Sequence, residues 1–171
     1  MKILFIGLSL SSSWGNGHAT TYRALLKALH ARGNACRFLE YDAPWYRENR
    51  DLERPDFAEL WLYEDLDELK AELRETGDEA DAIVLGSYVK DGIAIGDWLA
   101  ATFGEKVPLL YYDIDTPITL RTLAEGTCEY LSAELVERFD AYLSFSGGQA
   151  LELLKSRFGA RSAEAFHCSA D

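Results

Sequence analysis

Short apolar segments alternate with amphipathic segments along the whole chain. Seven apolar segments have the length and composition of buried strands. They cover residues 2–8, 36–41, 60–63, 82–85, 108–112, 141–145 and 163–166. Between them, the pattern predicts helices at residues 18–32, 64–81, 93–103, 119–124, 133–138 and 149–158. This alternation predicts a Rossmann-like α/β fold: a doubly wound parallel sheet with helices on both faces, in a single domain.

The first predicted helix has a clear apolar face. Tyr22, Leu25, Leu26 and Leu29 recur at the spacing of one side of a helix, and Gly33 is placed to end it.

The composition fits one globular domain with a substantial core. The chain has 171 residues, of which 48% are hydrophobic and 27% are charged. Its apolar runs are far shorter than the roughly 20 residues needed to span a bilayer, and its start lacks a signal-peptide pattern. The three cysteines form no Cys-x-x-Cys pair, which argues against a disulfide framework or a structural zinc site. We therefore expect a cytoplasmic protein without a transmembrane segment.

The net charge of −12 disfavours binding to nucleic acid or to anionic lipid, because both need clustered Lys and Arg. Much of the acid lies in residues 64–81, where Leu66, Leu69 and Leu73 stand at helical spacing. This stretch is typical of a helix with one solvated face.

Four loops that follow predicted strands are rich in Gly, Ser, Thr or Asp. They are residues 9–17, 86–92, 113–119 and 146–148. In an open α/β sheet, ligands bind outside the carboxyl ends of the strands, so these loops predict a binding site. The residues expected to contact a ligand are Trp14, Gly15, Asn16, Gly17, Ser87, Tyr88, Thr116, Ser146, Gly147 and Gly148.

The first of these loops differs from two known phosphate-binding patterns. Gly15 and Gly17 begin like a dinucleotide fingerprint, but Thr20 stands where the third glycine is needed. No Gly-Lys-Ser/Thr sequence follows, so the loop is not a P-loop either. A nicotinamide cofactor is therefore disfavoured. The glycines either contact a ligand or serve only the backbone geometry.

His18 follows directly, at the start of the predicted helix. The helix dipole disfavours its protonated form, so a neutral ring able to act as a general base is one interpretation. The other is a helix-start residue that binds a neighbouring loop.

Asp113 and Asp115 form an Asp-x-Asp pair that could hold a divalent cation or the hydroxyls of a sugar. Alternatively, Asp115 or Thr116 caps a turn while Asp113 pairs with Arg121. A second open choice concerns aromatic and basic loop residues, which either stack on a flat ligand or are buried. These are Trp14, Trp45, Tyr46, Tyr88 and Lys90.

Taken in order, these motifs resemble the N-terminal half of a GT-B type glycosyltransferase of the CgeB-like group of spore-protein and bacterial glycosyltransferase-like proteins. The segments that carry the resemblance are residues 2–8, 13–23, 86–88, 112–117, 142–148 and 168–171.

The resemblance implies two Rossmann-like domains that face each other across a cleft. Residues 1–171 would be the acceptor-side domain, and the domain that binds the nucleotide-sugar donor would be absent. His18 would be the base for an acceptor hydroxyl, Asp113 and Asp115 would orient that acceptor, and no metal or resident cofactor would be needed. The expected function is sugar transfer to a small-molecule or glycan acceptor, with little activity in the isolated domain. The alternative is a non-catalytic Rossmann-like module for ligand binding or interaction.

Overall fold

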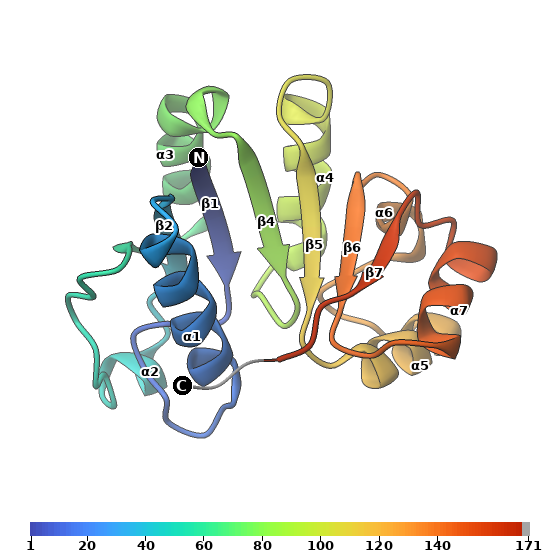
Figure 1. Ribbon diagram of the computed structural model, residues 1–171, viewed down its shortest axis with the longest axis horizontal. Helices are drawn as coiled ribbons and strands as arrows, with labels where there is room; N and C mark the ends of the chain where they lie inside the picture. Colours follow the sequence, from blue (N-terminus) through green and yellow to red (C-terminus); the bar gives the residue numbers. More distant parts are fainter. Residues whose placement is uncertain (169–171) are drawn as a thin grey trace.

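Seven parallel strands form one sheet in the order β3-β2-β1-β4-β5-β6-β7 (Figure 1). The computed structural model describes residues 1–168. The strands are β1 (Lys2–Gly7), β2 (Ala35–Tyr41), β3 (Glu59–Tyr63), β4 (Ala82–Gly86), β5 (Leu109–Asp113), β6 (Ala141–Ser144) and β7 (Ala163–Ala165). All seven predicted strands are therefore present, with ends that differ from the prediction by at most one residue.

The helices also follow the predicted order. They are α1 (His18–Ala31), α2 (Pro44–Arg47), α3 (Leu66–Thr76), α4 (Gly92–Phe103), α5 (Thr116–Glu125), α6 (Ala133–Val136) and α7 (Gln149–Phe158), with one 3-10 turn, η1 (Gly77–Glu79). Gly33 follows α1 with a φ of +78°, which confirms its role at the helix end. Helix α2 was not predicted, because four residues are too few to show a helical period.

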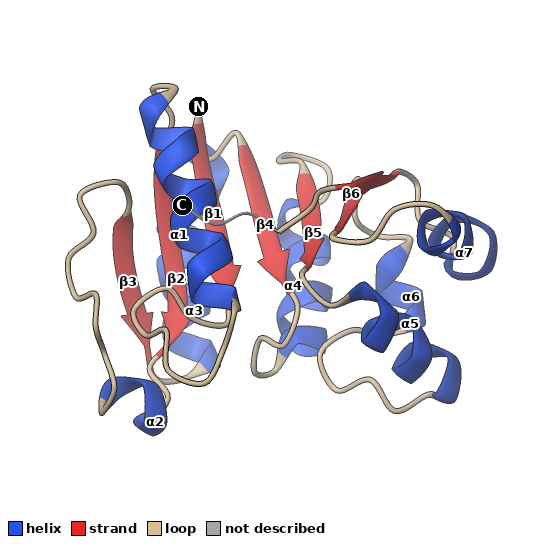
Figure 2. Ribbon diagram, turned by 60° about the horizontal axis from the view of Figure 1, so that its bottom comes forward, coloured by secondary structure: helices blue, strands red, loops and turns tan. Residues whose placement is uncertain are grey.

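Strand alternation builds a separate core on each face of the sheet. Ile3 and Phe5 of β1 pack toward α1, where Tyr22 and Leu26 are fully buried. Leu4 and Ile6 belong to the other core, together with the apolar faces of α3 and α4. Figure 2 shows α1 in front of β1 and β2, while α5, α6 and α7 gather at the β6 end of the sheet. The predicted Rossmann-like single-domain α/β fold is thus confirmed.

The solvated helix predicted in the acidic stretch is α3. Leu69 and Leu73 are buried, and the carboxylate of Asp65 caps the helix by accepting hydrogen bonds from the amides of Asp67 and Glu68. Within residues 1–168, no helix combines the length and apolarity that crossing a membrane requires.

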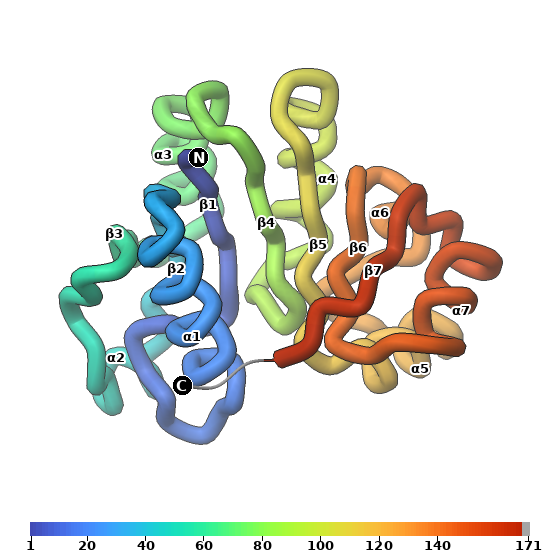
Figure 3. Tube along the Cα trace, viewed as in Figure 1, coloured from blue at the N-terminus to red at the C-terminus, as the bar shows by residue number. Residues whose placement is uncertain are grey.

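The strand order reverses between β1 and β4. The chain runs outward from β1 through β2 to β3, and outward from β4 to β7 in the opposite direction, as the colours of Figure 3 show. The loops that follow β1 and β4 therefore lead away from each other at the carboxyl ends of these two strands. Open α/β sheets bind ligands in the space between such loops.

Candidate functional site

Two glycines let helix α1 approach the carboxyl ends of β1 and β4. A Cβ at Gly7 would overlap the ring of Phe38, and one at Gly86 would overlap the hydroxyl of Tyr22. The Tyr22 ring lies edge-on to Phe38, with 4.9 Å between ring centroids. This close packing fixes the first turn of α1, and with it His18, at the point where the strand order reverses.

A buried carboxylate holds the loop that joins β1 to α1. Glu40 lies in β2, is fully buried, and accepts hydrogen bonds from the amides of Leu10 (2.6 Å) and Ser11 (2.8 Å). The hydroxyls of Ser11 (2.6 Å) and Ser9 (3.1 Å) donate to its other oxygen. The sequence analysis missed Glu40, although a lone acid in the apolar strand 36–41 was a usable signal.

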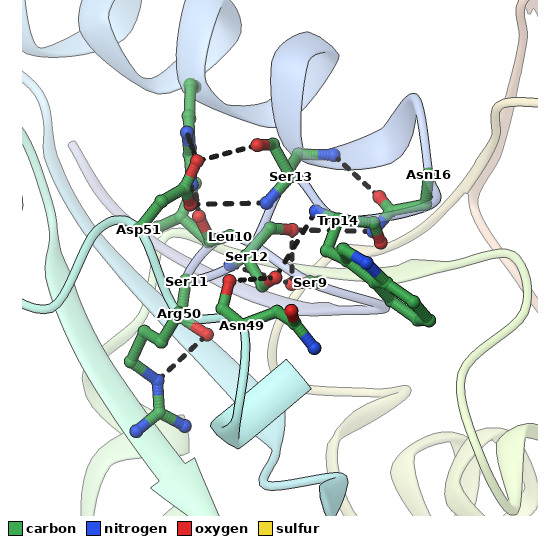
Figure 4. Close-up of polar contacts among 12 residues, drawn as sticks. Ser9, Leu10, Ser11, Ser12, Ser13, Trp14, Asn16, Asn49, Arg50 and Asp51 are labelled. Carbon is green, nitrogen blue, oxygen red and sulfur yellow. Dashed lines mark hydrogen bonds and ion pairs between the residues drawn. The ribbon is translucent and has the colours of Figure 1, made fainter. Parts of the chain in front are cut away.

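The outer part of the same loop is tied to residues 49–51 (Figure 4). The hydroxyl of Ser12 donates to the carbonyl of Asn49 (2.7 Å), and that of Ser13 donates to Asp51 (2.6 Å). Arg23 of α1 forms an ion pair with Asp51 at 2.5 Å. These contacts make the loop a fixed wall of the site.

The predicted loop residues divide into supporting and exposed ones. Asn16 accepts a hydrogen bond from the amide of Ala19 (3.1 Å), so it caps the first turn of α1. Gly15 has a φ of +67°, a backbone conformation that favours glycine, and a Cβ on Gly15 or Gly17 would meet open space. Trp14 is 55% exposed at the rim.

His18 is the first residue of α1 and is mostly buried. Its Nδ1 atom is buried and has no hydrogen-bond partner among residues 1–168. Burial lowers the pKa of His18 from its usual 6.5 to about 4, against an opposing effect of the Asp115 carboxylate. The imidazole is therefore neutral at pH 7.

Tyr88 connects His18 with Asp115. Its ring lies edge-on to His18, with 5.4 Å between ring centroids, and its hydroxyl donates to Asp115 Oδ2 at 3.0 Å. Burial raises the pKa of Tyr88, so the phenol stays protonated. Its φ is +63°, and that of Asp91 in the same loop is +58°. Strained non-glycine backbone of this kind is concentrated at functional sites.

Asp113 does not face the same space as Asp115. It is fully buried and accepts hydrogen bonds from Tyr142 (2.5 Å), from Thr119 (3.0 Å) and from the amide of Asp115 (3.0 Å). Burial raises its pKa, and these hydrogen bonds oppose the rise. In the described part of the chain it forms no ion pair with Arg121, the partner that we considered for it.

The remaining predicted residues lie beneath the loops or farther along the sheet. Ser87 is buried and accepts a hydrogen bond from the amide of Ile114 (3.2 Å). Thr116 is buried, and its hydroxyl accepts a hydrogen bond from the hydroxyl of Ser144 (2.8 Å). Residues 146–148 follow β6, two strands away from β4. The structure thus brings together His18, Tyr88 and Asp115 from the predicted set.

A cavity of about 120 Å³ opens beside Tyr88. A larger one, of about 310 Å³, lies at the opposite, amino-terminal edge of the sheet. Four charged side chains that line the larger cavity are already paired, Lys2 with Glu79 (2.9 Å) and Arg37 with Glu59 (2.6 Å). We therefore place the candidate site at the smaller cavity and His18. Among residues 1–168, no group of three or more His, Cys, Asp or Glu side chains is arranged to hold a metal ion.

No family model and no curated protein matches this chain. A search of solved structures finds the C-terminal domain of the coenzyme A biosynthesis bifunctional protein CoaBC. It is 11% identical, with a TM-score of 0.45 over 74% of this chain and 70% of that one.

The family prediction is corrected on this basis. The structure found is a domain of a coenzyme A biosynthesis protein and not a GT-B glycosyltransferase, and no CgeB-like family model matches. The predicted sugar transfer from a nucleotide-sugar donor to a glycan acceptor rested on that resemblance, so it is corrected as well. The alternative of a non-catalytic module gains no support from these findings either. Of the segments that carried the resemblance, residues 169–171 lie outside the described part.

Acid should destabilise the protein through His18. The unfolded chain, with a histidine pKa near 6.5, takes up the proton before the folded protein does, at about 4. Stability is therefore complete above pH 6.5 and decreases as the pH falls toward 4. Between pH 7 and pH 4, we expect urea titrations to show a loss about 3 kcal/mol larger in the wild type than in His18→Gln. His30→Gln, at the exposed end of the same helix, should keep the wild-type slope. Equal slopes in wild type and His18→Gln would contradict a desolvated His18.

Proposed function

We propose that this protein is an enzyme that acts on a small organic molecule, with neutral His18 as its proton acceptor. The substrate would occupy the crevice between the carboxyl ends of β1 and β4. Tyr88 would border it, and Asp115 would stabilise the imidazolium that forms when His18 takes up a proton.

The unpartnered Nδ1 of His18 is the observation that carries this proposal. A buried polar atom without a partner costs about 1–3 kcal/mol, and a catalytic role is one explanation for such an atom. Here the atom lies at the reversal of the strand order, beside a strained loop. A ligand that bonds to this ring would remove the cost.

The electrostatics suit a base better than an acid. With a pKa of about 4, the ring of His18 holds a free lone pair throughout the neutral range. Tyr88 donates a hydrogen bond to Asp115 and keeps that carboxylate directed toward the site. His18 would then act as the base and Asp115 would stabilise its protonated form, with Tyr88 as the positioning residue.

Hydrolysis of 4-nitrophenyl acetate tests for such a base. His18 would remove a proton from water as the water oxygen attacks the acetyl carbon. The 4-nitrophenolate would leave with the bonding electrons, and His18 would release its proton to solvent. We expect the wild type to be faster than His18→Gln on the order of tenfold, below the 10²–10⁴-fold typical of an evolved general base.

Matched substitutions make this result specific. His30→Gln should keep the wild-type rate, because His30 lies on the surface at the other end of α1. The His18-dependent part of the rate should stay constant from pH 8 to pH 6 and fall toward pH 4. A wild-type rate equal to that of His18→Gln would overturn the proposal.

A further inference from the structure

We propose that the cavity beside Tyr88 binds a single planar ring that carries an anionic substituent. This inference rests on the proposed function, because it names the substrate class for the site that contains His18.

Four aromatic side chains line the cavity. Tyr41 ends β2, Trp45 and Tyr46 belong to α2, and Tyr88 follows β4. Tyr46 is only 8% exposed, whereas Trp45 is 52% exposed at the mouth. The cavity therefore combines a rigid inner wall with a large aromatic surface that solvent still reaches. Such surroundings favour offset or edge-on contacts with a flat ring.

The volume of the cavity fits a ligand with a single ring. Its volume of about 120 Å³ is close to that of the roughly 150 Å³ protein cavity known to hold benzene. Whole drug-sized ligands fill about 300–1,000 Å³, so a dinucleotide or an oligosaccharide would not fit. The rest of the lining apart from Lys90 has no side chain that could form a hydrogen bond with a sugar hydroxyl; it consists of Gly7, Leu8, Ala43 and Val89.

Lys90 supplies a positive charge at this cavity. Among residues 1–168 it is the one charged side chain in the lining, and its Nζ lies 4.0 Å from the centroid of the Tyr41 ring. The nearby Arg50 is occupied by an ion pair with Asp42 at 2.6 Å. In a chain with a net charge of −12, a lysine held over an aromatic wall is a distinct site for a carboxylate or phosphate.

Tyr88 links this cavity to the candidate base. The same side chain lines the cavity and lies edge-on to His18. A substituent on the bound ring that extends past Tyr88 would reach the imidazole. The ring would anchor the substrate, and the bond to be changed would lie outside the cavity.

Binding of benzoate, followed by the change in its own ring-proton NMR signals as protein is added, tests the inference. Two comparison probes separate its parts: benzamide is planar but neutral, and cyclohexanecarboxylate is anionic but not planar. We expect benzoate to bind in the millimolar range and more tightly than either comparison probe.

Three variants locate the binding. Trp45→Ala should weaken benzoate about fivefold through lost ring contact. Lys90→Gln should weaken benzoate about threefold and leave benzamide unchanged, as expected for one exposed charge pair. Lys155→Gln removes an exposed lysine of α7 that does not line the cavity, and this variant should bind benzoate as the wild type does.

The outcomes distinguish this inference from the proposed function. Absence of benzoate binding, unchanged binding in Trp45→Ala and Lys90→Gln, or equal binding of cyclohexanecarboxylate would each overturn the inference. Benzoate binding with the expected variant pattern supports it even if ester hydrolysis proves independent of His18. In that case only the proposed function fails.

Discussion

Replacing Glu40 by leucine is expected to lower the free energy of unfolding by about 4 kcal/mol. The substitution removes the buried carboxylate and leaves its hydrogen-bond donors buried without an acceptor. Glu40 is fully buried and accepts hydrogen bonds from the amides of Leu10 and Ser11. Leucine fills a similar space but accepts none of them, and each buried unpaired donor costs about 1–3 kcal/mol. Urea unfolding followed by circular dichroism measures the loss.

Two further variants separate this network from the effect of charge alone. Glu40→Gln keeps one accepting oxygen, so its loss should be about 1–2 kcal/mol. Glu105→Leu removes an exposed acid and should stay within about 0.5 kcal/mol of the wild type. If Glu40→Leu were as stable as Glu105→Leu, Glu40 would not be what holds the loop after β1.

Gly86→Ala should have the second large effect, because overpacking should lower the free energy of unfolding by about 3 kcal/mol. The new Cβ would overlap the hydroxyl of Tyr22 and would also lie 3.4 Å from the carbonyl oxygen of Ile6. Neither group has room to move away, because Tyr22 is fully buried and Ile6 belongs to β1. The measurement is again the free energy of unfolding in urea.

A double-mutant cycle assigns this cost to the hydroxyl. The Tyr22 hydroxyl is buried without a partner among the described residues, so Tyr22→Phe alone should cost less than about 0.5 kcal/mol. Gly86→Ala combined with Tyr22→Phe should recover about half of the loss. Gly17→Ala, where the Cβ meets open space, serves as the control. Strictly additive losses would show that the two positions do not interact.

The sequence predicts this fold well because its signals are local. Apolar runs such as residues 2–8 and 82–85 are typical of strands buried on both faces, as in a parallel sheet. The spacing of Tyr22 and Leu26, with Gly33 after them, defined α1 almost to the residue. Helix α2 was missed because Pro44–Arg47 makes a single turn.

Only part of the candidate site was predicted, because some of its contacts join residues that are far apart in the sequence. The rule that ligands bind at the carboxyl ends of strands selected His18, Tyr88 and Asp115, which the structure brings together. It could not show that Glu40 and Asp51 fix the first loop, because those contacts join residues far apart in the sequence.

The family prediction was wrong because its motifs are not exclusive. Loops such as 13–23 and 142–148 contain the glycines and serines that many Rossmann-like sheets need after a strand. The same residues recur in proteins of unrelated function, so their order along the chain indicated the fold more strongly than the reaction.

The central position of β1 has a consequence for synthesis of the protein. Strand β1 is made first, yet one of its two neighbours is β4, where Ile3 pairs with Ala82. Until β4 leaves the ribosome, one edge of an apolar strand is without its partner and is open to pairing with other chains. The nascent chain therefore needs protection over its first half, and a pause in translation before β4 should reduce the yield of soluble protein.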